Sequence, residues 1–415
     1  MKSRVQRFSR QYSTIDVSGF LFENLLSNDY EMNDMCIVDS VIYFCGSHSA
    51  NGMVWAMIGY MPINTCNVRT HDIQGMSCNT FLTDLAVYKL ANGDYNLVAL
   101  GASLYDPSGY PGIVLDNCPD NLVHYTQQAN YSAYAEQFVM EASFSSPTSI
   151  PVNYNVKMLG GVQGKEEIDD VVLTDNYVAF VGIRPVGDVS QLTIRRCKRN
   201  NVLADFDNYF YFVEDNDYKW LFPKACPMKG DTIGIVMLGD DVGNGYSNKS
   251  VVVDLPSMAM ISHQHIDNGS EKLIPEDVVY MSTDHILVMV EDCEIGGVVR
   301  SVFHNLKPYD ASSPYNADCF YESHVGNRCF HSMDRLTDGE TFVAMGGDYW
   351  IMKVARNTVA NASCYVMLRK NVFNKSVFAT KKGYYDPIKC NVSFAPPQFS
   401  NSCQPSTLGN NCMEQ

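Results

Sequence analysis

Four aspartates that recur along the chain are the residues best suited to chemistry. Asp34, Asp84, Asp170 and Asp277 each stand just before an apolar stretch. If the segments that carry them surround one axis, their carboxylates would ring one mouth of a central channel. Carboxylate oxygens suit a hard cation, so the pattern predicts a metal site, with Ca²⁺ as the candidate ion. The alternative is structural, because an aspartate before a strand also caps a turn by accepting backbone N–H groups.

Aromatic residues in two Gly-containing loops are the candidates for ligand contact. Tyr105 and Tyr110 belong to the stretch YDPSGYPG, and Tyr349 and Trp350 follow the sequence GGD. Tyrosine and tryptophan provide a large contact area at a low cost in side-chain entropy. These four residues are therefore predicted to bind a glycan or a protein ligand, although each of them could instead belong to the core.

Familiar catalytic motifs are absent from the sequence. It contains no GxSxG, HExxH, P-loop or GxGxxG pattern, so no catalytic residue is assigned. A glycosidase needs two acids at a set separation, and the 46 Asp and Glu residues leave that pair undetermined. His263 and His265 would face the same side of a strand and could bind a metal, but an exposed loop is the favoured interpretation.

The elements that must position these residues form a repeat. The segment NDMCIVDSVIYFCGSHSANGMVWAMIGY contains a strand, a turn, a second strand, a loop and a third strand. Related segments begin near residues 83, 169, 229, 276 and 331, and the copy near 229 keeps only its apolar strand and glycine-rich exit. Such antiparallel units bury their faces by radial stacking. The chain is predicted to be an all-β, six-bladed β-propeller over residues 15–366, and a seventh blade within residues 125–159 is the alternative.

Two extensions flank the predicted propeller. Residues 1–14 are polar and basic and are expected to be disordered. Residues 367–415 are rich in Ser, Asn, Pro and Cys and are expected to pack on the propeller.

Charge and cysteine content restrict the partners and the compartment. A net charge of −16 argues against nucleic acid and anionic membranes as partners, and no apolar run is long enough for a transmembrane helix. The 14 dispersed cysteines indicate disulfides in an oxidising compartment, with buried thiols as the alternative. Cys36 and Cys45 fall on adjacent strands and could be neighbours. In a eukaryotic or viral host, six sequons would mark surface loops, at Asn130, Asn248, Asn268, Asn361, Asn374 and Asn391.

The segment NDMCIVDSVIYFCG, followed by a Gly-containing turn and a third strand, resembles the repeats of secreted β-propeller-like proteins of Bacteroidetes. The segment PMKGDTIGIVML is similar to another recurring blade of that group. This resemblance implies export to the periplasm or cell surface, and adhesion or ligand binding. It carries over no catalytic residue, because most of these proteins have no assigned function.

Two other families share single features with the chain. Six blades, cysteines and sequons are also compatible with the propeller head of viral attachment glycoproteins, although the hexapeptide NRKSCS is absent. The segment TDGETF at residues 337–342 superficially resembles a sialidase Asp box, but it occurs once and its glycine directly follows the aspartate.

The leading functional prediction is a secreted or cell-surface adhesion module without catalysis, which binds a glycan or protein through loops on one face. The alternatives are a viral-type attachment head, and a glycan hydrolase or lyase with acids at the channel mouth. One propeller fold hosts many unrelated functions, so the fold does not select among these classes.

Overall fold

The computed structural model describes residues 4–8, 17–21, 29–50, 53–63, 68–73, 80–104, 134–149, 153–159, 167–186, 189–206, 208–212, 218–241, 245–267, 273–295, 298–310, 312, 315–322, 330–335, 341–346, 351–355, 365–374, 380–384, 389–393 and 398–400. The chain divides into two compact units. Unit 1 contains Met1–Gln163, Cys197–Asp207 and Tyr385–Met413, and unit 2 contains Gly164–Arg196, Asn208–Tyr384 and Glu414–Gln415. Each unit is described by itself.

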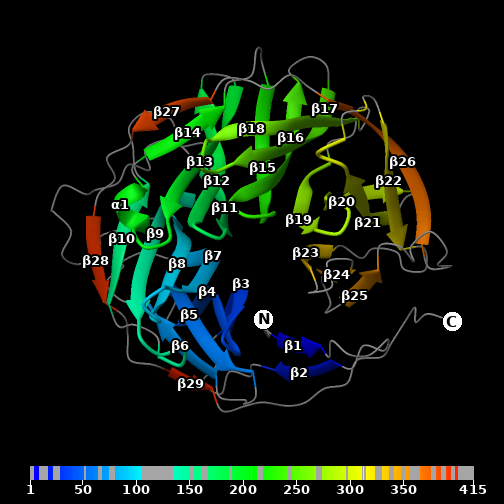
Figure 1. Cartoon of the computed structure of the whole chain (residues 1–415). Coiled ribbons are helices and arrows are strands. Elements are labelled where there is room, and N and C mark those ends of the chain that lie inside the picture. Colours follow the sequence, from blue (N-terminus) through cyan, green and yellow to red (C-terminus); the bar gives the residue numbers. More distant parts are fainter. Residues whose placement is uncertain are drawn as a thin grey trace. The chain divides into compact units, whose positions relative to one another are not determined.

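Unit 1 contains two antiparallel sheets in which strands follow one another in chain order (Figure 1). The first sheet consists of β3 (Asp29–Val38), β4 (Val41–Ala50), β5 (Met53–Pro62) and β6 (Val68–Asp72). The second consists of β7 (Thr80–Lys89), β8 (Tyr95–Leu104), β9 (Tyr134–Phe144) and β10 (Asn153–Leu159). The alternative of a seventh blade in residues 125–159 is wrong for the part described, because β9 and β10 are the outer strands of the second sheet.

A separate hairpin lies at the start of the chain. Strands β1 (Arg4–Phe8) and β2 (Val17–Leu21) pair antiparallel. Residues 4–8, which the composition predicted to be disordered, therefore form a strand.

Unit 2 repeats the same antiparallel order in four sheets. The third sheet of the chain consists of β11 (Glu167–Leu173), β12 (Tyr177–Val186), β13 (Val189–Lys198) and β14 (Asn208–Phe212). In the sequence, the short helix α1 (Val202–Asp205), which belongs to unit 1, precedes β14. The fourth sheet consists of β15 (Tyr218–Pro227), β16 (Thr232–Asp241), β17 (Gly245–Asp254) and β18 (Ala259–Asp267).

The fifth sheet consists of β19 (Pro275–Met281), β20 (Ile286–Ile295), β21 (Val298–Leu306) and β22 (Tyr315–Glu322). The sixth has three described strands, β23 (Phe330–Arg335), β24 (Thr341–Gly346) and β25 (Ile351–Ala355). The fourth repeat begins at β15, although the sequence placed its start near residue 229. The segment near residue 229 that was recognised from the sequence covers the β15–β16 turn and β16, and so misses β15.

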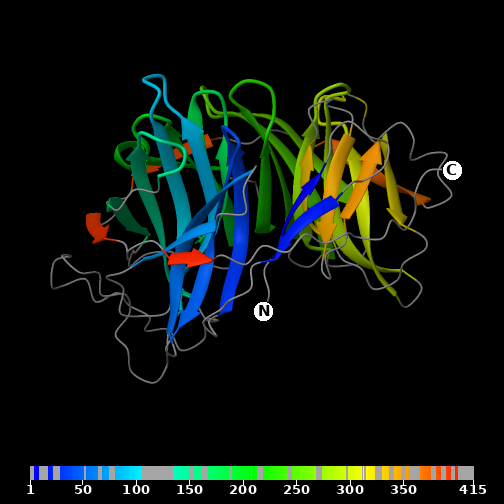
Figure 2. The same cartoon turned by 90° about the horizontal axis from the view of Figure 1, so that it is seen from below.

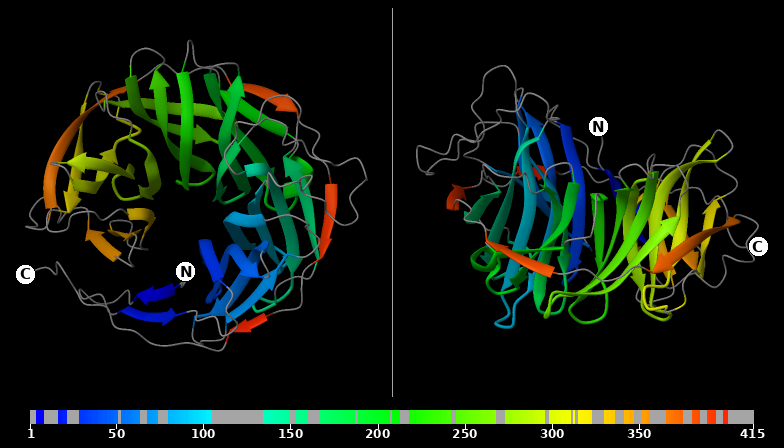
Figure 3. Two further views of the ribbon diagram at one scale, coloured as in Figure 1. Left: turned by 180° about the vertical axis from the view of Figure 1, so that it is seen from behind. Right: turned by 90° about the horizontal axis from the view of Figure 1, so that it is seen from above.

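The C-terminal segment adds a further strand to the outer edge of several sheets. Strand β26 (Tyr365–Asn374) pairs with both β18 and β22. Three later strands then pair with the last strands of earlier sheets: β27 (Thr380–Tyr384) with β14, β28 (Lys389–Ser393) with β10, and β29 (Gln398–Ser400) with β6. Figure 3 shows these strands in orange and red along the outer edges. They cover edge amides that would otherwise be open to pairing with another chain.

Apolar faces of neighbouring sheets pack on one another within each unit. In unit 1 one cluster joins the first two sheets and includes Tyr43, Ile58, Leu97 and Phe138. In unit 2 three clusters join successive sheets in the same way. Figure 2 shows the strands of these sheets from the side. The chain is therefore all-β and built from stacked sheets of the type that forms propeller blades, as the repeat predicts.

Four cysteines whose side chains are described do not form disulfides. Cys36, Cys45, Cys197 and Cys226 are free thiols. Cys36 lies opposite Tyr43 and Cys45 lies opposite Asp34, so the two cysteines are not directly paired but are diagonal neighbours on one face of adjacent strands, as the sequence suggested. Burial raises the pKa of Cys36, Cys45 and Cys226, which keeps these thiols protonated. The disulfide prediction is wrong for these four, and the side chains of the other ten cysteines are not described.

One predicted surface sequon is in the core. Asn248 lies on β17 with its side chain fully buried. In the part of the chain that is described, no helix is long and apolar enough to cross a membrane.

Candidate functional site

The first strand of every sheet carries an irregularity at the position of the recurring aspartates. In unit 1 the register shifts between Met32 and Asp34 and between Leu82 and Asp84. In unit 2 the corresponding shifts end at Asp170, Lys224, Asp277 and Ser332. These first strands are edge strands, so some of their amides point away from their own sheet.

Three of the aspartates bind such an amide in the adjoining sheet. Asp34 Oδ2 accepts the N–H of Leu85 at 2.9 Å. Asp170 Oδ2 accepts the N–H of Ala225 at 2.7 Å, and Asp277 Oδ2 accepts the N–H of Met333. Each donor stands one residue after the equivalent position of its own sheet. The carboxylates therefore link first strands of neighbouring sheets, which is the role of backbone acceptor that the structural alternative foresaw.

Asp84 and Asp277 also bond locally. Asp84 Oδ1 accepts the N–H of Leu85 at 2.6 Å, and Asp277 Oδ1 accepts the N–H of Val278 at 2.7 Å. A hydrogen bond to a charged acceptor contributes about 1.5–3 kcal/mol, so these contacts matter to the stability of each unit.

Asp277 has a strongly perturbed carboxyl. Burial raises its pKa from 3.8 to about 7, and the nearby Asp170 raises the pKa further. The amides of Met333 and Val278, and the charge of Lys224, act in the opposite direction. Lys224 occupies the recurring position of the fourth sheet, so the residue that replaces aspartate there brings a positive charge near Asp277.

The metal prediction for Asp34, Asp84, Asp170 and Asp277 stays a prediction. Among the described residues, no group of three or more His, Cys, Asp and Glu side chains is placed to hold a metal ion. The predicted contact residues Tyr105, Tyr110, Tyr349 and Trp350 lie outside the described residues. In their own sheets, Tyr105 and Tyr110 fall in the β8–β9 connection, and Tyr349 and Trp350 fall in the β24–β25 connection. Both are connections between a second and a third strand.

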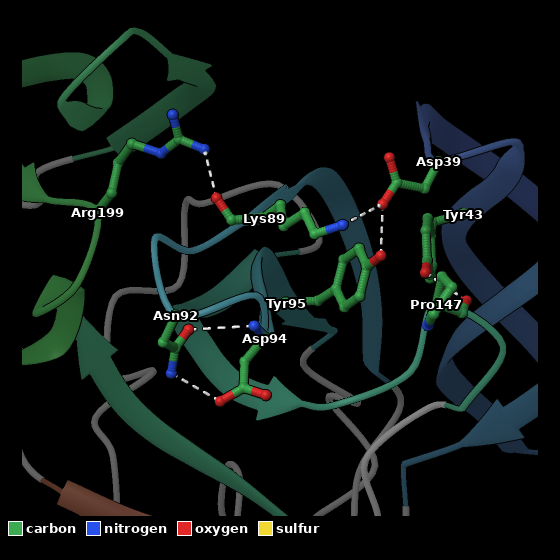
Figure 4. A network of polar contacts seen from close by, with 8 residues as sticks. All are labelled: Asp39, Tyr43, Lys89, Asn92, Asp94, Tyr95, Pro147 and Arg199. Carbon is green, nitrogen blue, oxygen red and sulfur yellow. Dashed lines mark hydrogen bonds and ion pairs between the residues drawn. The ribbon is translucent and has the colours of Figure 1, made fainter.

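A polar network lies at the opposite end of the unit 1 strands, at the β3–β4 and β7–β8 turns (Figure 4). Asp39 and Ser40 both have positive φ, 46° and 64°, in a two-residue hairpin loop. The Asp39 carboxylate accepts hydrogen bonds from Tyr95 and from Lys89, whose Nζ lies 2.9 Å away. The bond from Tyr95, and then that from Lys89, lowers the pKa of Asp39.

Further contacts extend this network. Tyr43 donates to the carbonyl of Pro147, and Arg199 donates to the carbonyl of Lys89 at 3.3 Å (Figure 4). Asn92 and Asp94 bond within the β7–β8 turn. These contacts tie the hairpin tips of unit 1 together and present mixed charge at the surface.

Buried histidine–carboxylate pairs are the functional groups that the sequence did not reveal. His48 Nδ1 lies 2.7 Å from Asp72 Oδ2 in unit 1, with both side chains 1% exposed. In unit 2, His304 Nε2 lies 2.7 Å from Glu291 Oε1, and Asn248 donates to Glu291 Oε2. No local motif identifies these pairs, because strand pairing brings the partners together from separate strands.

His263 and His265 are also buried. They lie on β18 with ring centroids 5.2 Å apart, and His263 lies 5.5 Å from Trp220. They face the same side, as expected for a strand, but the exposed-loop interpretation is wrong.

Comparisons with known proteins give no family for this chain. No family model and no curated protein matches it. Among solved structures, it is similar to a Trypanosoma rangeli sialidase in complex with sialic acid, over 97% of this chain and 96% of that chain. The identity is 9% and the TM-score is 0.25. A similarity at this level supports neither a family nor an activity.

Proposed function

We propose that this chain is a non-catalytic recognition module, exported from the cytoplasm, that binds a glycan or a protein through side chains at the ends of its sheets. The observation that carries the proposal is the use of Asp34, Asp170 and Asp277 as acceptors for backbone amides of adjoining sheets. The alternative of a glycan hydrolase or lyase needs acids of this kind at the channel mouth for catalysis. Here the same carboxylates accept hydrogen bonds from the backbone.

Burial of the histidine–carboxylate pairs supports the same proposal. A general acid or base must reach within hydrogen-bond distance of the substrate. His48 and Asp72 are 1% exposed, and His304 and Glu291 are 0% exposed. In this conformation the pairs serve the scaffold, and recognition is left to exposed residues at strand ends.

Binding to an array of glycans and surface proteins, with and without EDTA, tests the proposal. We expect saturable binding to one ligand class, together with wild-type binding by an Asp170→Asn variant that remains folded. Loss of binding in EDTA would instead make the recurring aspartates metal ligands. An array without any bound ligand would overturn the proposal for the ligands tested.

One observation favours a second candidate, a glycan hydrolase or lyase. A carboxyl with a pKa of about 7, such as that of Asp277, suits general acid catalysis near neutral pH. Turnover of reducing-end-labelled oligosaccharides, lost in Asp277→Asn while folding is retained, would establish this activity and remove the non-catalytic proposal.

A further inference from the structure

Three aromatic rings form a shelf at one end of the fifth sheet, in unit 2. Tyr280 is the last residue but one of β19, His285 lies in the β19–β20 turn, and Tyr309 lies in the turn after β21. Tyr280 Oη lies 2.6 Å from His285 Nδ1, and the two rings stack with centroids 6.2 Å apart. The Tyr309 ring meets His285 edge-on at 6.2 Å. We call Tyr280, His285 and Tyr309 the aromatic shelf.

The shelf is open on its outer side. Tyr280 is 4% exposed and forms the base, whereas Tyr309 is 50% exposed and His285 is also exposed. Tyr309 is one of the few large apolar side chains that the described chain leaves at the surface. An exposed ring held by a second ring is a rigid contact surface, so binding would cost little side-chain entropy.

The backbone at His285 indicates that the ring is there for a purpose besides the turn. His285 has a φ of 55°, in the left-handed region that favours glycine. In the first hairpins of the second and fourth sheets, Gly93 and Gly230 have positive φ of 93° and 66°, whereas the first sheet, like the fifth, has non-glycine residues with positive φ there, Asp39 and Ser40. A side chain in this region strains the backbone, because its Cβ comes close to the neighbouring carbonyl oxygen. In the fifth sheet the strained residue is His285, and its ring stacks on Tyr280 and is hydrogen-bonded to the Tyr280 hydroxyl. Strained residues of this kind gather at binding sites.

The charges beside the shelf favour a neutral ligand. Asp284 precedes His285, and Asp310 follows Tyr309. Lys307 lies two residues before Tyr309, and Arg335 donates to the carbonyl of Tyr280 at 3.0 Å. Two acids and two bases balance locally, and the chain as a whole carries −16, which disfavours an anionic sugar. Asp310 already accepts bonds from the Ser312 hydroxyl and amide, which shows that polar groups of hydroxyl-binding type border the rings.

We propose that the aromatic shelf is a subsite for a neutral sugar, with the apolar face of a pyranose ring stacked on Tyr309 and His285 and its hydroxyls bonded to the polar groups at the border. This inference rests on the proposed recognition function and specifies one ligand class and one place for it. Tyr280 is the positioning residue, because its hydroxyl fixes the orientation of the His285 ring.

Binding of the full chain to immobilised neutral gluco-, galacto- and manno-oligosaccharides, with sialylated and uronic-acid oligosaccharides beside them, tests the subsite. We expect Tyr309→Ala to weaken neutral-sugar binding by roughly threefold to tenfold, and Tyr309→Phe to preserve it. His285→Gly should weaken binding similarly without lowering the midpoint of thermal unfolding, because glycine relieves the backbone strain. Tyr280→Phe should have a smaller effect.

Ile261→Ala is the matched control, because Ile261 is 48% exposed in the same unit but outside the shelf. We expect this variant to bind like the wild type. The His285 imidazole resonance should also shift when a bound oligosaccharide is titrated into the wild-type protein.

The outcomes separate the two proposals. Wild-type sugar binding that survives Tyr309→Ala and His285→Gly would overturn the shelf and leave the recognition function standing. Selective binding of acidic sugars, or loss of a protein ligand in the shelf variants, would overturn the neutral-sugar assignment. A wild type that binds no glycan and no protein would overturn both proposals.

Discussion

The folding stability of this chain should depend on the ionisation of Asp277. Its pKa is about 7 when folded, against 3.8 for an ordinary aspartate. Between these values the folded chain holds a proton on Asp277 that the unfolded chain has lost, so the contribution of this group to stability is largest below about pH 4 and falls as pH rises towards 7. At about 1.36 kcal/mol per pKa unit, the loss is at most about 4 kcal/mol. Asp277 keeps part of its residue surface exposed, so a smaller loss is expected.

Replacement of Asp277 by asparagine isolates this effect. The amide oxygen can still accept the N–H of Met333, but the side chain no longer titrates. We expect Asp277→Asn to exceed the wild type in stability by about 2 kcal/mol at pH 8, and to equal or fall below it at pH 5. Urea unfolding followed by far-UV circular dichroism at pH 5, 6, 7 and 8 measures this difference.

Asp310→Asn is the control with the opposite sign. Hydrogen bonds from the Ser312 side chain and amide lower the pKa of Asp310, so its contribution is present at neutral pH and lost as pH falls. Asp310 is exposed to solvent, and its effect should therefore be small. A stability difference between Asp277→Asn and the wild type that does not change with pH, or that grows in favour of the variant as pH falls, would refute the account of Asp277.

Three further outcomes follow from local packing and backbone geometry. Asn248 is fully buried and bonded to Glu291, so peptide mapping of protein from a glycosylating host should find this sequon unmodified. Gly59→Ala would place a Cβ 2.1 Å from the Phe44 ring and 2.9 Å from the Arg69 carbonyl, and should cost about 1–3 kcal/mol in urea unfolding. Phe222 has a φ of 52° and is 41% exposed. Phe222→Gly should therefore increase the free energy of unfolding by about 1 kcal/mol, which a higher midpoint of thermal unfolding would show.

The repeat could be predicted because its signals are local. Apolar alternation, turn residues and the aspartate before each first strand recur within about 30 residues, and each sheet uses them in the same order. The fourth repeat was displaced because Lys224 stands where the other sheets of unit 2 carry Asp or Ser. In addition, the pairing of β15 is interrupted at Phe222 and Pro223, which together stand opposite the single residue Met237 of β16. The pairing of the C-terminal strands with earlier sheets leaves no such local signal.

The site could be predicted only in part for a similar reason. The sequence places Asp34 and Asp170 before apolar strands, but the amides that they accept belong to residues 51 and 55 positions later. Partners at such separations follow from sheet stacking, which sequence spacing does not encode. The imidazoles of His263 and His265 were misjudged because polarity predicts exposure, whereas Trp220 gives His263 an aromatic partner in the core.

Two sheets carry another residue at the position of the recurring aspartate, Lys224 in the fourth sheet and Ser332 in the sixth. The direction of the carboxylate–amide hydrogen bonds explains why both substitutions are tolerated. The amide that a carboxylate accepts belongs to the residue after the equivalent position in the next sheet, so the side chain at that position is free to change. Lys224 and Ser332 can therefore replace aspartate while Ala225 and Met333 still donate to Asp170 and Asp277. A lysine cannot accept an amide from the fifth sheet, and there Asp277 accepts the Val278 amide itself. Asp277 thus serves two backbone amides in a buried setting, and the charge of Lys224 lowers the pKa that burial raises.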